Sequence, residues 1–149
     1  MGYRALPGAS QFDIWFKGYP CTPLESIFAD LGIDVNESNY KIVHSDIAVL
    51  LEAASAVFVP SSTVALEAVA FGCSVIIPLF PDTMLMNPLV DAAYHDYSLI
   101  TSTDDFKARV EDVIFKNRDA VCEKSKEFVK NYWNLDKTLP LWTSIFLKN

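Results

Sequence analysis

The chain lacks the sequence signatures of several large classes of protein. It has 149 residues, of which only 5 are glycine. These glycines are scattered, so the glycine-rich fingerprints of dinucleotide-binding and P-loop proteins are missing. No apolar run approaches the roughly 20 residues of a membrane-spanning helix. The first residues carry one positive charge and no apolar segment, so we expect no signal peptide.

Cysteine, histidine and positive charge are also scarce. The three cysteines are widely spaced and form no Cys-x-x-Cys pair, which argues against a zinc site and favours a reducing, cytosolic compartment. The net charge is −7 and no basic stripe is present, so nucleic acid is not an expected partner. Any histidine-based acid–base chemistry must use His44 or His95, the only two histidines.

Apolar residues make up 51% of the chain, which is enough for a core with two covered faces. Their patterns predict strands that alternate with helices, which is typical of an α/β fold with a mostly parallel sheet. We expect strands at residues 12–17, 40–43, 56–60, 75–78 and 98–100. We expect helices at residues 23–31, from 45 or 46 to 54, at 63–71, from 102 or 103 onward, and at 118–132. The long segment 79–91 is predicted to be a loop.

The domain organisation follows from the same patterns. Residues 1–11 are predicted to form a tail or linker, and residues 12–134 a single domain. Residues 135–149 are rich in large apolar side chains. They either pack on the sheet of this domain or cross to a partner domain.

The segment 55–78 is the most informative part of the sequence, because a hydroxyl-rich turn joins a buried strand to a short helix. One hydroxyl is enough to cap a helix, whereas Ser61, Ser62 and Thr63 supply three at the positive end of the helix dipole. Plain capping and an anion site both fit this pattern. Glu67 is the only charged residue in the helix that follows. It either binds sugar hydroxyls of a nucleotide or makes a structural bond to the backbone or to a lysine.

This segment resembles the C-terminal, donor-binding domain of GT-B glycosyltransferases, especially the bacterial enzymes of capsule, lipopolysaccharide and sialic acid synthesis. The likeness lies in the hydroxyl-rich turn, in Glu67-Ala68 and in the glycine and apolar strand at residues 72–78. It extends over about residues 12–115, and Ser74 stands where the family usually has proline. The resemblance implies a Rossmann-like three-layer αβα sandwich that forms one half of a GT-B architecture.

The resemblance also implies what the turn would bind. Ser61, Ser62 and Thr63 would bind the phosphates of the donor, and Glu67 would bind its ribose hydroxyls. The donor would be a UDP- or CMP-activated sugar. The resemblance implies no metal and no separate cofactor, and it identifies no catalytic residue in this chain.

Two further groups of residues receive roles from the same resemblance. The backbone at Val43 and His44 would face the base of the donor. The loop that contains Asp82, Thr83 and Asn87 would approach the donor sugar or phosphate.

A GT-B enzyme closes two domains on its substrates, and this chain has room for one. We therefore expect a fragment or subunit that lacks the N-terminal acceptor-binding domain and transfers no sugar by itself. The parent protein would act in surface polysaccharide or lipopolysaccharide synthesis, in the cytoplasm or at the inner face of the membrane. The alternatives are a sugar-nucleotide epimerase of the same fold and a non-catalytic flavodoxin- or receiver-like binding module.

Overall fold

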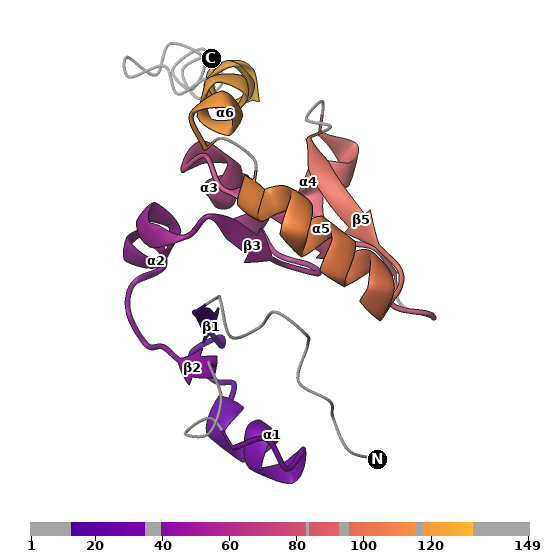
Figure 1. The fold of residues 1–149 in the computed structure, drawn as a ribbon. Helices are drawn as coiled ribbons and strands as arrows, with labels where there is room; N and C mark the ends of the chain where they lie inside the picture. Colours follow the sequence, from indigo (N-terminus) through magenta and orange to yellow (C-terminus); the bar gives the residue numbers. More distant parts are fainter. Residues whose placement is uncertain (1–12, 35–39, 83, 93–95, 116–117, 133–149) are drawn as a thin grey trace, which may run out of the picture. The chain divides into compact units, whose positions relative to one another are not determined.

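The computed structural model describes residues 13–34, 40–82, 84–92, 96–115 and 118–132 (Figure 1). In these residues strands alternate with helices and every strand pair is parallel, so the predicted α/β fold with parallel pairing is confirmed. The chain divides into two compact units, Met1–Ile47 and Ala48–Asn149. None of the helices described is both long enough and apolar enough to cross a membrane.

The first unit is one βαβ element. It comprises β1 (Ile14–Phe16), α1 (Leu24–Asp30) and β2 (Tyr40–Ile42), and the two strands pair in parallel. The ring of Phe16 contacts those of Phe28 and Tyr40 edge-on, with centroids 4.8 and 5.7 Å apart. Edge-to-face contacts of this kind are favourable for aromatic rings, and they fasten α1 to the strands.

Gly32 terminates α1 from just beyond its last turn, as the sequence predicts. The amide of Gly32 donates to the carbonyl of Ala29 (3.0 Å), and the amide of Ile33 donates to the carbonyl of Phe28 (2.9 Å). These two bonds form a Schellman motif, which requires a residue with positive φ after the helix. Gly32 has a φ of 67° and meets this requirement without steric strain.

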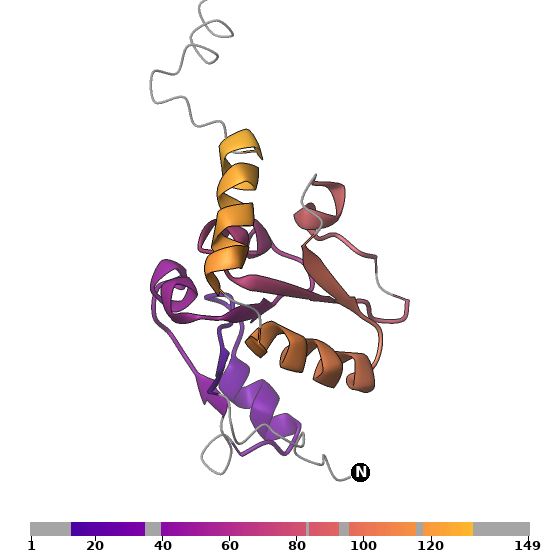
Figure 2. The same ribbon diagram turned by 45° about the horizontal axis from the view of Figure 1, so that its top comes forward.

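The second unit is a three-stranded parallel sheet with helices. Its elements are α2 (Ile47–Ala53), β3 (Ala56–Phe58), α3 (Val64–Ala70), β4 (Ser74–Pro78), α4 (Pro88–Asp91), β5 (Tyr97–Ile100), α5 (Thr103–Phe115) and α6 (Arg118–Tyr132). The strand order is β3-β4-β5, so β4 lies in the centre. Figure 2 shows α5 on one side of this sheet and α3 with α6 on the other.

The core of the second unit is centred on β4, which is buried along its whole length. Ile76 of β4 packs with Ile100 of β5 and Val113 of α5. Val75 and Ile77 point to the opposite face because side chains alternate along a strand. Both are buried, at 1% and 0% exposure. The run of apolar residues in β4 is therefore explained by the helices that cover both faces of this strand.

The end of α3 is a second Schellman motif. The amide of Gly72 donates to the carbonyl of Val69 (2.9 Å), and the amide of Cys73 donates to the carbonyl of Ala68 (2.9 Å). Gly72 has a φ of 73°, and a Cβ placed on it would lie 3.2 Å from the Cβ of Cys122 in α6. Glycine is therefore needed here both for its backbone conformation and for the close approach of α6.

The structure differs from the sequence-based expectation in one element. Residues 79–91, predicted as a loop, contain the four-residue helix α4. A single turn is too short to show helical periodicity in a sequence. The segments 1–11 and 135–149 lie outside the described residues. The single domain over residues 12–134 stays a prediction.

Candidate functional site

The candidate site is the turn between β3 and α3, at the carboxyl end of β3. Val59 is buried, and its amide donates to the carbonyl of Ile76 (3.0 Å), so backbone pairing to β4 continues one residue beyond the strand. Pro60 and Ser61 are then exposed. The turn thus begins where ligands usually bind to parallel sheets, outside the carboxyl ends of the strands.

The three hydroxyls of the turn have different surroundings. The Oγ of Ser62 accepts a hydrogen bond from the amide of Val64 (3.2 Å), so this half-buried hydroxyl satisfies one amide of the first turn. Thr63 is the residue that precedes α3, and its side chain makes no capping hydrogen bond. Ser61 and Thr63 are both exposed. Ser62 therefore does the capping, and the other two hydroxyls face solvent.

Glu67 lies on the side of α3 that is partly exposed to solvent. It is half-buried, whereas Ala65, Leu66, Ala68 and Val69 of the same helix are buried. Glu67 follows Thr63 by four residues, a spacing that places the two side chains on one face of a helix. Within the described part of the chain, the carboxylate of Glu67 forms no ion pair and no hydrogen bond. The sequence also allowed a structural ion pair between Glu67 and a lysine, and no lysine among the described residues forms it.

The loop after β4 contains the other predicted donor contacts. Asp82 is exposed and has a φ of 62°, a left-handed conformation that is uncommon outside glycine but tolerated by aspartate. Thr83 lies outside the described residues. Met84 and Met86 are among the most exposed apolar side chains, at 83% and 66%. The predicted contacts of Asp82 and Thr83 with a donor stay predictions.

Asn87 is 1% exposed and has two well-defined partners. Its Nδ2 donates to the carbonyl of Val59 (3.0 Å), and its Oδ1 accepts from the amide of Leu89 (3.1 Å). Asn87 therefore caps α4 and fastens it to the end of β3. The sequence carried a signal for this cap, because asparagine before proline is typical of the start of a helix. Its contact with a donor stays a prediction.

The carboxyl end of β5 carries a polar group that the sequence did not single out. Ser102 caps α5, as one of the two predicted caps, by accepting from the amide of Asp105 (3.1 Å). The Oδ2 of Asp105 accepts from the hydroxyl of Thr101 (2.7 Å) and from its amide (3.2 Å). These bonds lower the pKa of Asp105 below its ordinary value, and the bond from the Thr101 hydroxyl has the largest effect.

The residues predicted to face the base of a donor lie in the first unit. The amide of Val43 donates to the carbonyl of Phe16 (3.0 Å), which extends the pairing of β1 and β2 by one residue. His44 is exposed, and its Nε2 lies 3.3 Å from the Oε1 of Glu25. The predicted contacts of Val43 and His44 with the base stay predictions.

No group of three or more histidine, cysteine, aspartate or glutamate side chains that could hold a metal ion is present among the described residues. A scan against protein-family models and searches of curated proteins and of solved structures find no match to this chain.

Proposed function

We propose that this chain is the donor-nucleotide-binding domain of a nucleotide-sugar-dependent glycosyltransferase. The observation that carries the proposal is the arrangement of the β3–α3 turn. Ser61 and Thr63 expose their hydroxyls at the carboxyl end of a strand, and Glu67 follows on the same helix face as Thr63. The resemblance of residues 55–78 to the donor-binding segment of GT-B enzymes supports the same assignment.

The proposed fold is a Rossmann-like three-layer sandwich that forms one half of a GT-B architecture. Its support is the alternation of strands and helices and the parallel order β3-β4-β5, with helices on both sides of β4 (Figure 2). In this proposal an acceptor-binding domain or subunit completes the enzyme. The complete enzyme acts in surface polysaccharide or lipopolysaccharide synthesis, in the cytoplasm or at the inner face of the membrane.

The proposed chemistry at the turn is hydrogen bonding to the donor, without a metal. The hydroxyls of Ser61, Ser62 and Thr63 donate to phosphate oxygens. The carboxylate of Glu67 accepts hydrogen bonds from the ribose hydroxyls. These contacts orient a UDP- or CMP-activated sugar, and the acceptor-binding half supplies the catalytic base.

The affinity of the isolated chain is expected to be low. No lysine or arginine lies within residues 48–106, the part of the chain that contains the turn, so no nearby sequence neighbour neutralises the phosphates. In addition, half of a closing cleft leaves the donor partly in water. We expect dissociation constants on the order of millimolar, which correspond to about −4 kcal/mol.

Ligand-observed NMR tests the proposal with UDP, CMP, GDP, ADP and their sugars. Glu67→Gln removes the charge of the proposed ribose contact, and Glu111→Gln makes the same change at an exposed position of α5. We expect one nucleotide to bind, and Glu67→Gln to weaken its binding about three- to tenfold, because hydrogen bonds to charged groups are the stronger ones. Glu111→Gln should leave the binding unchanged.

Two outcomes would contradict the proposal. If none of the nucleotides binds, or if both glutamine variants bind equally well, the turn is only a helix cap. Conversion of a bound sugar nucleotide into its epimer, visible in the same spectra, would favour the epimerase alternative.

A further inference from the structure

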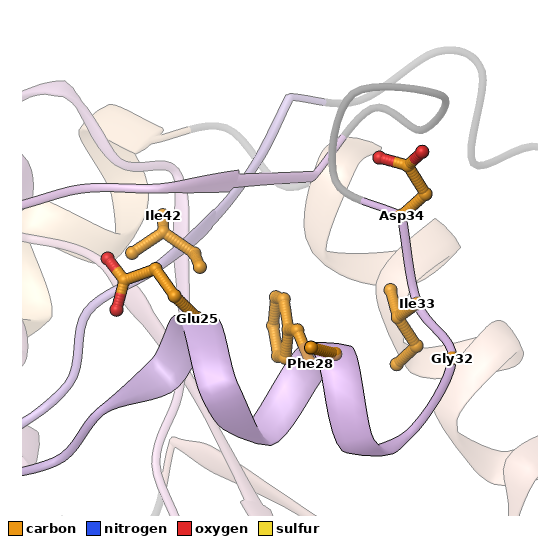
Figure 3. A pocket seen from close by; sticks show the side chains of 7 residues that line it. Glu25, Phe28, Gly32, Ile33, Asp34 and Ile42 are labelled. Carbon is orange, nitrogen blue, oxygen red and sulfur yellow. The ribbon is translucent and has the colours of Figure 1, made fainter.

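The first unit contains a cavity that the proposed donor site does not use (Figure 3). Its volume is about 350 Å³, within the usual range for small-molecule sites. The lining comes from α1, from the turn after it and from β2. The described lining of the cavity therefore belongs to one βαβ element.

The floor of the cavity is apolar and held in place. Phe28 is buried, and its ring contacts that of Phe16 edge-on. The Schellman motif after α1 bonds Ile33 to Phe28 through the backbone, and Ile42 of β2 lines the cavity as well. No heavy atom of the described residues lies within 4 Å of a Cβ built on Gly32, so these residues leave the rim of the cavity open at this point.

Two carboxylates stand at opposite ends of this floor. Glu25 lies in the first turn of α1 and Asp34 follows its last turn, with Phe28 between them (Figure 3). From Glu25 to Asp30, the last residue of α1, the helix rises about 7.5 Å at ~1.5 Å per residue, and Asp34 lies four residues further along the chain. Glu25 is 63% exposed and pairs with His44 at 3.3 Å, so it keeps access to solvent. Among the described residues, no lysine or arginine lines the cavity.

We propose that this cavity binds a linear aliphatic diammonium ion. One ammonium group contacts Glu25, the other contacts Asp34, and the methylene chain lies over Phe28, Ile33 and Ile42. Charge complementarity selects the two ends, and contact with the apolar floor removes the methylene groups from water. A third charge in the middle of the chain would lie over the floor and lose its hydration, which disfavours triamines.

An NMR titration of the full chain with hexamethylenediamine at neutral pH tests the ligand class. We expect saturable shifts of the amide signals of α1 and β2. n-Hexylamine lacks one charge and should bind about two- to fivefold more weakly, in line with one exposed ion pair, and the matching diol lacks both charges and should bind more weakly still. Spermidine carries a central charge and should also bind more weakly than the diamine.

Charge-removing variants test the two ends of the site. E25Q and D34N keep the size of the side chain and should each weaken the diamine about two- to fivefold. The matched control is D30N, which removes an exposed acid of the same helix that does not line the cavity and should leave binding unchanged. Because all three positions are exposed, thermal unfolding should be nearly the same for all of the variants.

Three results would overturn the proposal. The diamine could cause no saturable shift, or spermidine could bind more tightly than the diamine. D30N could also weaken binding as much as E25Q and D34N. The last two results would mean that an acidic chain attracts cations in general, without a built site.

Discussion

The side-chain amide of Asn87 donates a hydrogen bond to the carbonyl oxygen of Val59, 28 residues earlier in the chain, at 3.0 Å. This bond connects the start of α4 to the residue that precedes the hydroxyl-rich turn. Asn87 also accepts from the amide of Leu89. One buried amide therefore satisfies two backbone groups and holds the loop after β4 beside the end of β3.

Replacing Asn87 is expected to destabilise the second unit. Asn87→Ala leaves the Val59 carbonyl and the Leu89 amide without partners, which should lower the free energy of unfolding by about 2–4 kcal/mol. Urea denaturation measures this loss. The control is Asn131→Ala at an exposed position of α6, with an expected change within about 0.5 kcal/mol. Equal stability of the two variants would contradict the role of the Asn87 amide.

Asn87→Asp separates the two hydrogen bonds of this side chain. Ionised aspartate still accepts from Leu89, but it has no proton for Val59 and places a negative charge beside that carbonyl oxygen. We therefore expect a destabilised variant at neutral pH that regains stability in acid, where the carboxyl group is protonated and can donate. Urea midpoints measured at several pH values would detect this, and a midpoint difference from wild type that does not change with pH would contradict it.

Two substitutions of Ser74 are expected to change stability in different directions. Its side chain is buried at 6% exposure, and its hydroxyl has no hydrogen-bond partner in the part of the chain that the structure describes. Its amide donates to the carbonyl of Ser55 (3.1 Å). Ser74→Ala removes an unsatisfied buried hydroxyl, so stability should be unchanged or rise by up to about 1 kcal/mol.

Ser74→Pro introduces the residue that the GT-B pattern usually has at this position. Proline has no amide proton, so the bond to Ser55 is lost and the variant should be destabilised by about 1–3 kcal/mol. Thermal unfolding of the two variants compares them directly. If Ser74→Pro were as stable as Ser74→Ala, the start of β4 would not depend on the bond to Ser55.

Gly72 and Gly32 form a matched pair for measuring the effect of close packing. Both have positive φ, but only Gly72 faces a neighbour, because atoms of Cys122 lie 3.2–3.4 Å from the point that a Cβ on this glycine would occupy. Gly32→Ala should cost about 1 kcal/mol from its backbone conformation alone. Gly72→Ala should cost about 2–4 kcal/mol, because the contact with α6 adds to the same conformational cost.

Amide hydrogen exchange measures the two glycine variants separately. Protection of the Ile33 amide reports on the end of α1, and protection of the Cys73 amide reports on the end of α3. Equal losses of protection at the two sites would show that α6 accommodates the extra methyl group by a small shift.

The pKa of Asp105 predicts how the start of α5 responds to acid. The hydroxyl of Thr101 is the main cause of the lowered pKa, followed by the amide of the same residue. A carboxylate whose pKa is lower in the folded chain stabilises it at pH values above its ordinary pKa, about 3.9. This stabilisation is lost as the pH falls from there through the lower, folded-state value.

An NMR titration of the Asp105 carboxyl group checks this assignment. Thr101→Ala should raise the pKa of Asp105 toward its ordinary value, because it removes the hydroxyl, which is the largest cause of the lowering, and leaves the bonds to the amide of residue 101 and to Ser102. Thr103→Ala, an exposed threonine in the first turn of the same helix, should leave the titration unchanged. If the two variants titrated alike, the Thr101 hydroxyl would not be the cause of the lowered pKa.

Much of the fold could be predicted because its signals are local. The strands and helices follow from apolar periodicity, and the ends of α1 and α3 follow from Gly32 and Gly72. The helix α6 spans residues 118–132 as expected. The helix α4 was missed because four residues make a single turn, and what holds that turn is the long-range bond of Asn87 to Val59.

The candidate site, like the fold, could be predicted from the sequence only in part. The sequence by itself determined that hydroxyls lie between a strand and a helix, since a cap and the residues it caps are neighbours in the chain. Only the tertiary structure decided that Ser62 makes the cap, that Ser61 and Thr63 face solvent, and that Asn87 is buried. Those outcomes depend on which segments pack together. Side-chain burial arises from contacts between residues far apart in the sequence, and local periodicity carries no record of those contacts.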